Sequence, residues 1–155
     1  MAKLARQTAV EALLQINDEG GYSNVVLHNL VTRNELSAQD TALCSVLVYG
    51  ALERRLTLDH IIVAYSKTPV RKLTPAVREI LRISLYQLLY LEHIPDSAAV
   101  NEAVKLTRLM KVADRFSKIG SETDLSPANI NEVVGNCVLY FRTRVPRNVT
   151  LTYNG

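Results

Sequence analysis

The sequence predicts a single all-α domain, and three observations support this fold class. Apolar residues recur every three or four positions along most of the chain, which is the period of a helix with one buried side. Short polar or proline-containing segments of the kind that begin helices separate these stretches. Aromatic residues make up only 6% of the 155 residues, whereas sheet proteins favour aromatic and β-branched residues.

The first helix is expected over residues 3–17, where alanine, leucine and isoleucine follow the helical period. The segment DEGGY, residues 18–22, ends this helix because adjacent glycines favour a turn. Ser23 then begins a short second helix that extends to about Thr32.

Ser37 and Asp40 have the spacing of a capping box, so they are expected to begin a long third helix. Gly50 is expected to mark a bend in it. The residues expected to face the core are Leu43, Val46, Leu47 and Tyr49.

Thr57 is expected to cap a fourth helix that ends at Tyr65, before a loop over residues 66–72. Thr74 and Pro75 form a clear helix start. Threonine caps exposed N–H groups, and proline at the first helical position gives up only a donor that has no partner there anyway.

The helix from Pro75 to about Leu91 is apolar on nearly every side, which predicts that it lies at the centre of the domain. Arg82 is the exception within it. A buried guanidinium needs a carboxylate partner, and Glu102 on the following helix is one candidate.

That following helix is expected to begin at Asp96 or Ser97 and to end at about Lys111. A polar loop over residues 112–125 comes next, and a last helix covers residues 126–144. The domain therefore spans residues 1–145, and residues 146–155 form a C-terminal tail.

The charge distribution suggests a phosphate-rich partner. The net charge is only +3, but no acidic residue precedes Glu11 and none follows Glu132. The two ends are therefore basic, as in many nucleic-acid-binding domains, although solvated termini are the plain alternative. Further arginines and lysines fit either phosphate contacts or ordinary solvated helix faces: Arg54, Arg55, Arg71, Lys72 and Arg78.

No catalytic constellation accompanies these charges. The sequence lacks phosphate-binding glycine loops, a zinc-protease motif and a nucleophile elbow, so no catalytic residue, metal site or cofactor is expected in this chain. Cys44 and Cys137 lie in apolar helical stretches and are expected to be buried free thiols. The sequence contains neither a signal peptide nor a membrane-spanning stretch, which predicts a cytoplasmic protein.

Two blocks in the middle of the chain resemble the NusB family. They are LTPAVREILRISLYQL at residues 73–88 and IPDSAAVNEAVKL at residues 94–106, and NCVL at residues 136–139 resembles the family's last helix. The resemblance covers about residues 3–144. It implies a NusB-like bundle of about six to eight helices in two packed sub-bundles.

Two groups share this domain, namely free-standing transcription antitermination factors and the N-terminal domain of Sun-type rRNA cytosine-5 methyltransferases. Four segments resemble the second group: residues 21–24 (GYSN), 47–50 (LVYG), 54–59 (RRLTLD) and 87–91 (QLLYL). The resemblance implies the rRNA-recognition module of a 16S-type rRNA 5-methylcytosine methyltransferase. S-adenosylmethionine would then bind a catalytic domain that lies beyond this chain.

The family's RNA surface lies near its first helix and the start of its last. Carried over to this sequence, it implies RNA contacts by Lys3, Arg6, Gln7, Asn136, Arg142 and Arg144. The alternatives are a stand-alone antitermination factor and a protein-interaction module. The latter would dock a small-subunit ribosomal protein, or a catalytic domain in cis, through an apolar face that includes Tyr86 and Tyr90.

Overall fold

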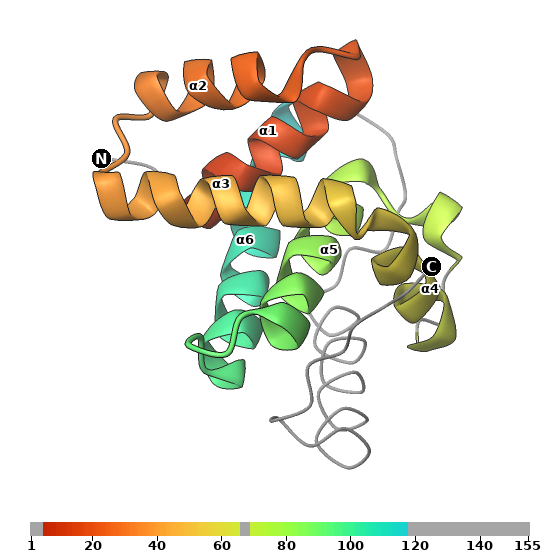
Figure 1. Ribbon diagram of the computed structural model, residues 1–155. Helices are drawn as coiled ribbons and strands as arrows, with labels where there is room; N and C mark the ends of the chain where they lie inside the picture. The colour runs from red at the N-terminus through yellow and green to blue at the C-terminus, as the bar shows by residue number, and fades with distance from the viewer. Residues whose placement is uncertain (1–4, 66–68, 118–155) are drawn as a thin grey trace.

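The computed structural model describes residues 5–65 and 69–117, and the helices of this part of the chain share one hydrophobic core (Figure 1). No strand occurs among these residues. The elements are α1 (Ala5–Glu19), α2 (Ser23–Arg33), α3 (Ala38–Glu53), α4 (Arg55–Tyr65), the short 3-10 helix η1 (Val70–Lys72), α5 (Pro75–Tyr90) and α6 (Asp96–Ser117).

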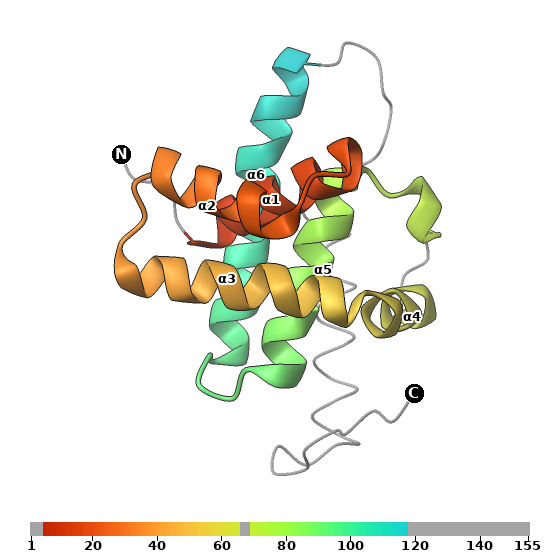
Figure 2. The same ribbon diagram turned by 45° about the horizontal axis from the view of Figure 1, so that its top comes forward.

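The helices form two groups, each arranged around one helix. In the first group α2 and α3 pack against α1, and in the second α4 and α6 pack against α5. Contacts of α5 with α1 and α3 join the groups. Figures 1 and 2 both show α5 and α6 as a hairpin of neighbouring helices, with α3 lying across them. This arrangement confirms the predicted all-α bundle with two sub-bundles.

Two of the predicted helix starts are confirmed by their capping hydrogen bonds. Ser37 precedes α3, and its hydroxyl accepts a hydrogen bond of 3.1 Å from the Asp40 N–H. Thr74 precedes α5, and its hydroxyl accepts one of 3.4 Å from the Val77 N–H, with Pro75 in the first turn. These caps satisfy N–H groups that have no partner within the helix itself.

Two predicted boundaries are wrong. Thr57 lies inside α4, because this helix begins at Arg55, directly after Arg54, which caps the end of α3. The second error concerns α6, which continues to Ser117 rather than ending at about Lys111. Residues 112–117 (VADRFS) mix apolar and polar side chains without a clear helical period, but most of them are compatible with a helix. The predicted last helix, residues 126–144, and the tail lie outside the described residues.

The prediction for the inner face of α3 is partly wrong. Leu47 is fully buried, but the exposed fractions of Val46 and Tyr49 are 42% and 43%. Because α3 is apolar on most sides, periodicity alone does not identify the side that meets α1 and α5. Cys44 is a buried free thiol, as predicted, and burial raises its pKa to about 12.

Gly50 permits the close approach of α3 and α5. Helix α3 runs without interruption through this residue to Glu53, so the glycine does not end the helix there. A Cβ atom at position 50 would overlap the outer edge of the Tyr86 ring on α5, at Cζ and the two Cε atoms. The ring occupies the space that any other residue would need for its side chain, which makes glycine a packing requirement here.

Candidate nucleic-acid interface

Arg6 lies in the first turn of α1, and a hydrogen bond holds it against α5. Its Nε donates to Oε1 of Gln87 over 2.8 Å. Gln87 is buried, and its Nε2 donates in turn to the carbonyl oxygen of Ile83 over 2.9 Å. The amide is therefore oriented by its own helix, and it positions the half-buried guanidinium of Arg6 at the junction of α1 and α5.

The structure places only part of the predicted RNA site. Gln7 follows Arg6 on α1 and is half-buried. The other four residues predicted for the site lie outside the described residues: Lys3, Asn136, Arg142 and Arg144. Sequence reasoning missed Gln87 as the partner of Arg6. The sequence did contain a signal for this contact. Gln87 lies in a largely apolar helix, and an amide that is buried there requires hydrogen-bond partners.

Two tyrosines of α5 and the arginine that caps α3 form a second group of contacts near the C-terminal end of α5. The rings of Tyr86 and Tyr90 stack with their centroids 5.1 Å apart, and the guanidinium carbon of Arg54 lies 5.2 Å from the centroid of Tyr90. This distance is within the range of a cation–π interaction. Burial, followed by the charge of Glu53, raises the pKa of Tyr86. Tyr86 packs against the core, and both rings are half-buried.

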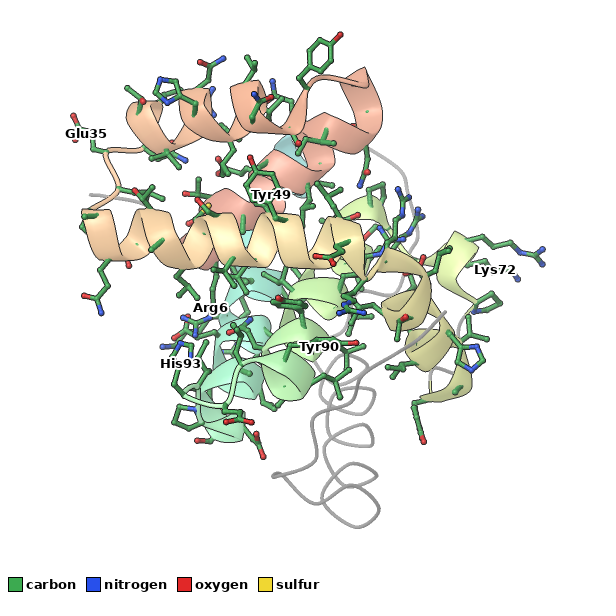
Figure 3. All side chains as sticks on the ribbon, viewed as in Figure 1. Arg6, Glu35, Tyr49, Lys72, Tyr90 and His93 are labelled. Atoms are coloured by element: carbon green, nitrogen blue, oxygen red, sulfur yellow. The ribbon has the colours of Figure 1, made fainter. Side chains whose placement is uncertain are left out.

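Figure 3 shows Arg6 and Tyr90 on the same side of α3, whereas Lys72 lies at the opposite end of the molecule. Arg6 and Tyr90 therefore place a cationic and an aromatic group on the same side of α3 (Figure 3). Both kinds of group are used to bind single-stranded nucleic acid, the first for phosphates and the second for unstacked bases.

The predicted partner of Arg82 is wrong. Its Nε and Nη2 donate to the two carboxylate oxygens of Asp59 on α4, over 2.7 and 2.8 Å, and its Nη1 donates to Glu79. Glu102, the predicted partner, instead pairs with Lys105 one turn along α6 at 3.3 Å. Helical spacing shows that Arg82 faces inward, but it does not identify the helix that faces it.

The contacts of Arg82 belong to a larger polar network that joins three helices. Asn17 at the end of α1 donates to Glu79 over 2.7 Å, and Arg55 at the start of α4 donates to Asn17 over 3.4 Å. Burial raises the pKa of Glu79, and the positive charge of Arg82 opposes that rise. Because these groups are engaged with one another, the network links α1, α4 and α5 and is not a binding site.

The described part of the chain contains no group of three or more His, Cys, Asp or Glu residues that is able to hold a metal ion. Among the same residues, none of the helices combines the length and apolar character needed to cross a membrane.

Comparison with known proteins identifies a family. The NusB family matches residues 3–118 of the chain. The chain is 41% identical over 104 residues to the probable ribosomal RNA small subunit methyltransferase B of Bacillus subtilis, and 39% identical to that of Synechocystis. In both, the match covers 67% of this chain but only 23% of the relative. The chain thus corresponds to less than a quarter of these relatives.

A second group of relatives is more distant but more similar in length. The transcription antitermination protein NusB of Shewanella baltica is 28% identical over 104 residues, which cover 67% of this chain and 78% of that protein.

Two solved structures share the fold. Thermotoga maritima NusB superposes with a TM-score of 0.71 at 17% identity, and the match covers 90% of this chain and 93% of that one. A chain in a crystal structure of a plectonemic RNA supercoil superposes with a TM-score of 0.73 at 19% identity, covering 92% and 96%. At these identities the likeness establishes the fold alone.

Proposed function

The chain belongs to the NusB family, and from this premise we propose that it is a cytoplasmic, non-catalytic RNA-binding domain. We propose further that it is the N-terminal rRNA-recognition module of a small-subunit rRNA cytosine-5 methyltransferase. The observation that carries this proposal is the 41% identity to such a methyltransferase over a match that covers only 23% of it. S-adenosylmethionine and the catalytic groups would then belong to a separate domain.

The arrangement of Arg6 supports a role in RNA binding. The bond from Nε to Gln87 fixes the guanidinium before any ligand arrives, so less conformational entropy is lost on binding. The other N–H donors of the group have the geometry that suits phosphate oxygens. Together with Lys3, Arg142 and Arg144, this residue would supply the phosphate contacts, while Gln7 and Asn136 would hydrogen-bond to bases or sugars.

A stand-alone antitermination factor is the second candidate, and the match to Shewanella baltica NusB, which covers 78% of that protein, supports it. The two candidates share RNA binding but differ in the RNA that they recognise. Titration with small-subunit rRNA fragments and with leader RNAs from rRNA operons would separate them.

A protein-docking role makes a different prediction. Leu56 and Val63 lie seven residues apart on α4 with exposed fractions of 86% and 60%, so an apolar stripe on that helix faces solvent. Capture of a small-subunit ribosomal protein from nuclease-treated extract, without any affinity for RNA, would favour this role over the proposed one.

The direct test is fluorescence anisotropy of a labelled small-subunit rRNA fragment with the full 155-residue chain. We expect a Kd on the order of micromolar and a logarithm of affinity that falls with the logarithm of salt concentration by about 0.7 for each phosphate contacted. An affinity that is the same at low and high salt would exclude phosphate binding.

The matched comparison for the site uses two double variants that remove the same charge. Arg6→Gln/Arg142→Gln neutralises the proposed site. Arg33→Gln/Lys105→Gln neutralises two exposed cations that each face a carboxylate, Glu11 and Glu102. Only the first is expected to lower the affinity and the salt dependence. Equal behaviour of the two variants would show that the site is placed wrongly.

A further inference from the structure

Three cations belong to the segment where η1 leads into α5, at the opposite end of α5 from Gln87, the partner of Arg6. Arg71 and Lys72 form the end of η1, and both are exposed. Arg78, in the second turn of α5, donates from Nη2 to the carbonyl oxygen of Leu73 over 3.1 Å. This bond turns the guanidinium back toward the residue that follows Lys72. Arg71, Lys72 and Arg78 are called the η1 surface below.

The positive charge of the η1 surface is not balanced by the nearby acids. Asp59 and Glu79 are the flanking carboxylates, and the sequence contains no Asp or Glu between them. Both are engaged by Arg82, and Arg55 joins the same network through Asn17. The negative charges of the two carboxylates and the positive charges of the two arginines therefore cancel within the network. Among the described residues, no ion pair joins an acidic residue to the η1 surface.

Arg78 also has a buried donor without an acceptor. Its Nε is enclosed by the protein and has no hydrogen-bond partner. An unsatisfied buried donor is costly, and an oxygen-bearing anion or a water is the usual remedy. The first turn of α5 contributes no acidic side chain, so the partial positive charge of the helix start adds to that of the three cations.

The η1 surface is separate from the Arg6 site. Arg78 and Gln87 are nine residues apart on α5, which corresponds to roughly 14 Å at 1.5 Å per residue. Figure 3 shows Lys72 projecting from the right-hand edge of the molecule and Arg6 on the left. A ligand that touches both must be long and must carry negative charge along its length, which describes an RNA strand.

From this geometry we infer that the η1 surface is a second phosphate-binding surface for RNA. One RNA strand contacts both surfaces: its backbone lies on the η1 surface, and another part of the same strand lies at Arg6. This inference rests on the proposed function. Arg71, Lys72 and Arg78 contact phosphates regardless of base sequence, because their charge attracts the phosphates, which are the same at every nucleotide.

The test compares two double variants of the full chain, each with two fewer positive charges. Arg71→Gln/Lys72→Gln alters the η1 surface, whereas Arg33→Gln/Lys105→Gln is the control. Binding of a fluorescein-labelled oligouridine is measured by anisotropy over a series of salt concentrations. We expect the slope of log affinity against log salt to become shallower by about 1.4 in the first variant, at about 0.7 per lost phosphate contact. The control keeps the wild-type slope.

Three outcomes would overturn the inference. The first is a slope in the η1 variant equal to that of the control, and the second is a loss of affinity without any change of slope. The third is competition by polyglutamate as effective as that by RNA at equal charge, which would indicate an acidic protein partner. The altered side chains are exposed, so circular dichroism should show the same unfolding temperature for both variants.

The experiment also separates the two proposals. If the wild-type chain does not bind the rRNA fragment, the proposed function fails and the inference fails with it. If the wild type binds and requires Arg6 and Arg142, but the η1 variant behaves like the control, only the inference fails.

Discussion

The two halves of α5 are held in the bundle by different kinds of contact. In the first half, charged groups from α4 and α5 pair inside the protein, with Arg82 joining Asp59 and Glu79. In the second half the groups that α5 itself contributes are neutral, although Arg6 and Arg54 reach them from outside the helix. The ring of Tyr86 lies against Gly50 of α3, and the amide of Gln87 accepts from Arg6.

The difference shows two ways of setting the position of one helix. A buried guanidinium tolerates few arrangements, since each donor needs an acceptor at the right place, and so it fixes which residues of α4 and α5 oppose one another. A glycine opposite a tyrosine sets the distance between α3 and α5 by shape alone. Three substitutions test this comparison, in order of decreasing effect.

Replacing Arg82 with methionine should have the largest effect. It leaves Glu79 buried and Asp59 without its bidentate partner, and loss of one member of a buried ion pair costs about 3–5 kcal/mol. The free energy of unfolding is measured by urea denaturation. The control is Lys105→Met, which removes an ion pair whose lysine side chain is 65% exposed and should cost at most about 1 kcal/mol. Equal losses in the two variants would contradict a charge-based link.

Gly50→Ala should come second. Alanine normally stabilises an α-helix relative to glycine by about 0.5–1 kcal/mol. Here the new Cβ would overlap the ring of Tyr86, so we expect a loss of about 1–3 kcal/mol instead. The same substitution in a Tyr86→Ala background should cost little or even stabilise. A loss that is the same in both backgrounds would show that Tyr86 is not the cause.

The smallest effect should be the dependence of stability on acidic pH, which Glu79 in the charged half of α5 produces. Burial raises the pKa of Glu79 in the folded chain above its ordinary value of 4.5. The folded protein therefore favours the protonated carboxyl. The stabilisation that this preference contributes is fully present below pH 4.5, and it is lost as the pH rises through the raised pKa of Glu79.

Glu79→Gln removes this titration while keeping an oxygen that accepts from Asn17. The free energy of unfolding of the wild type, relative to this variant, should fall as the pH rises through that window and then become constant. Urea denaturation at a series of pH values measures the difference. A difference that grows with pH would mean that pairing with Arg82 outweighs burial.

Much of the fold follows from local patterns. The hydroxyl-bearing caps Ser37 and Thr74 begin their helices where the sequence predicts, because capping depends on residues only three positions apart. Burial of α5 follows equally well, since a helix that is apolar on nearly every side has no stable place except the interior. The candidate site is only partly tested, because among its predicted residues Arg6 and Gln7 alone lie in the described part of the chain.

Other features depend on which helices meet. Tyr49 was expected in the core and is exposed, because α3 is apolar on more than one side and the packing of α1 and α5 selects the buried one. Arg82 pairs with Asp59, twenty-three positions away, rather than with the predicted Glu102. The helical spacing around Arg82 and Asp59 does not reveal that α4 and α5 cross at these two residues.

By itself, then, the sequence determined the α-helices of the described residues, most of their starts and the need for a partner at each buried polar residue, because these depend on short-range spacing and on the cost of burial. The tertiary structure alone decided which partner meets that need. It joined Arg6 to Gln87 across 81 positions and brought Arg78 back to the turn that carries Lys72. Such contacts depend on the crossing of helices far apart in the chain, and no local pattern encodes that crossing.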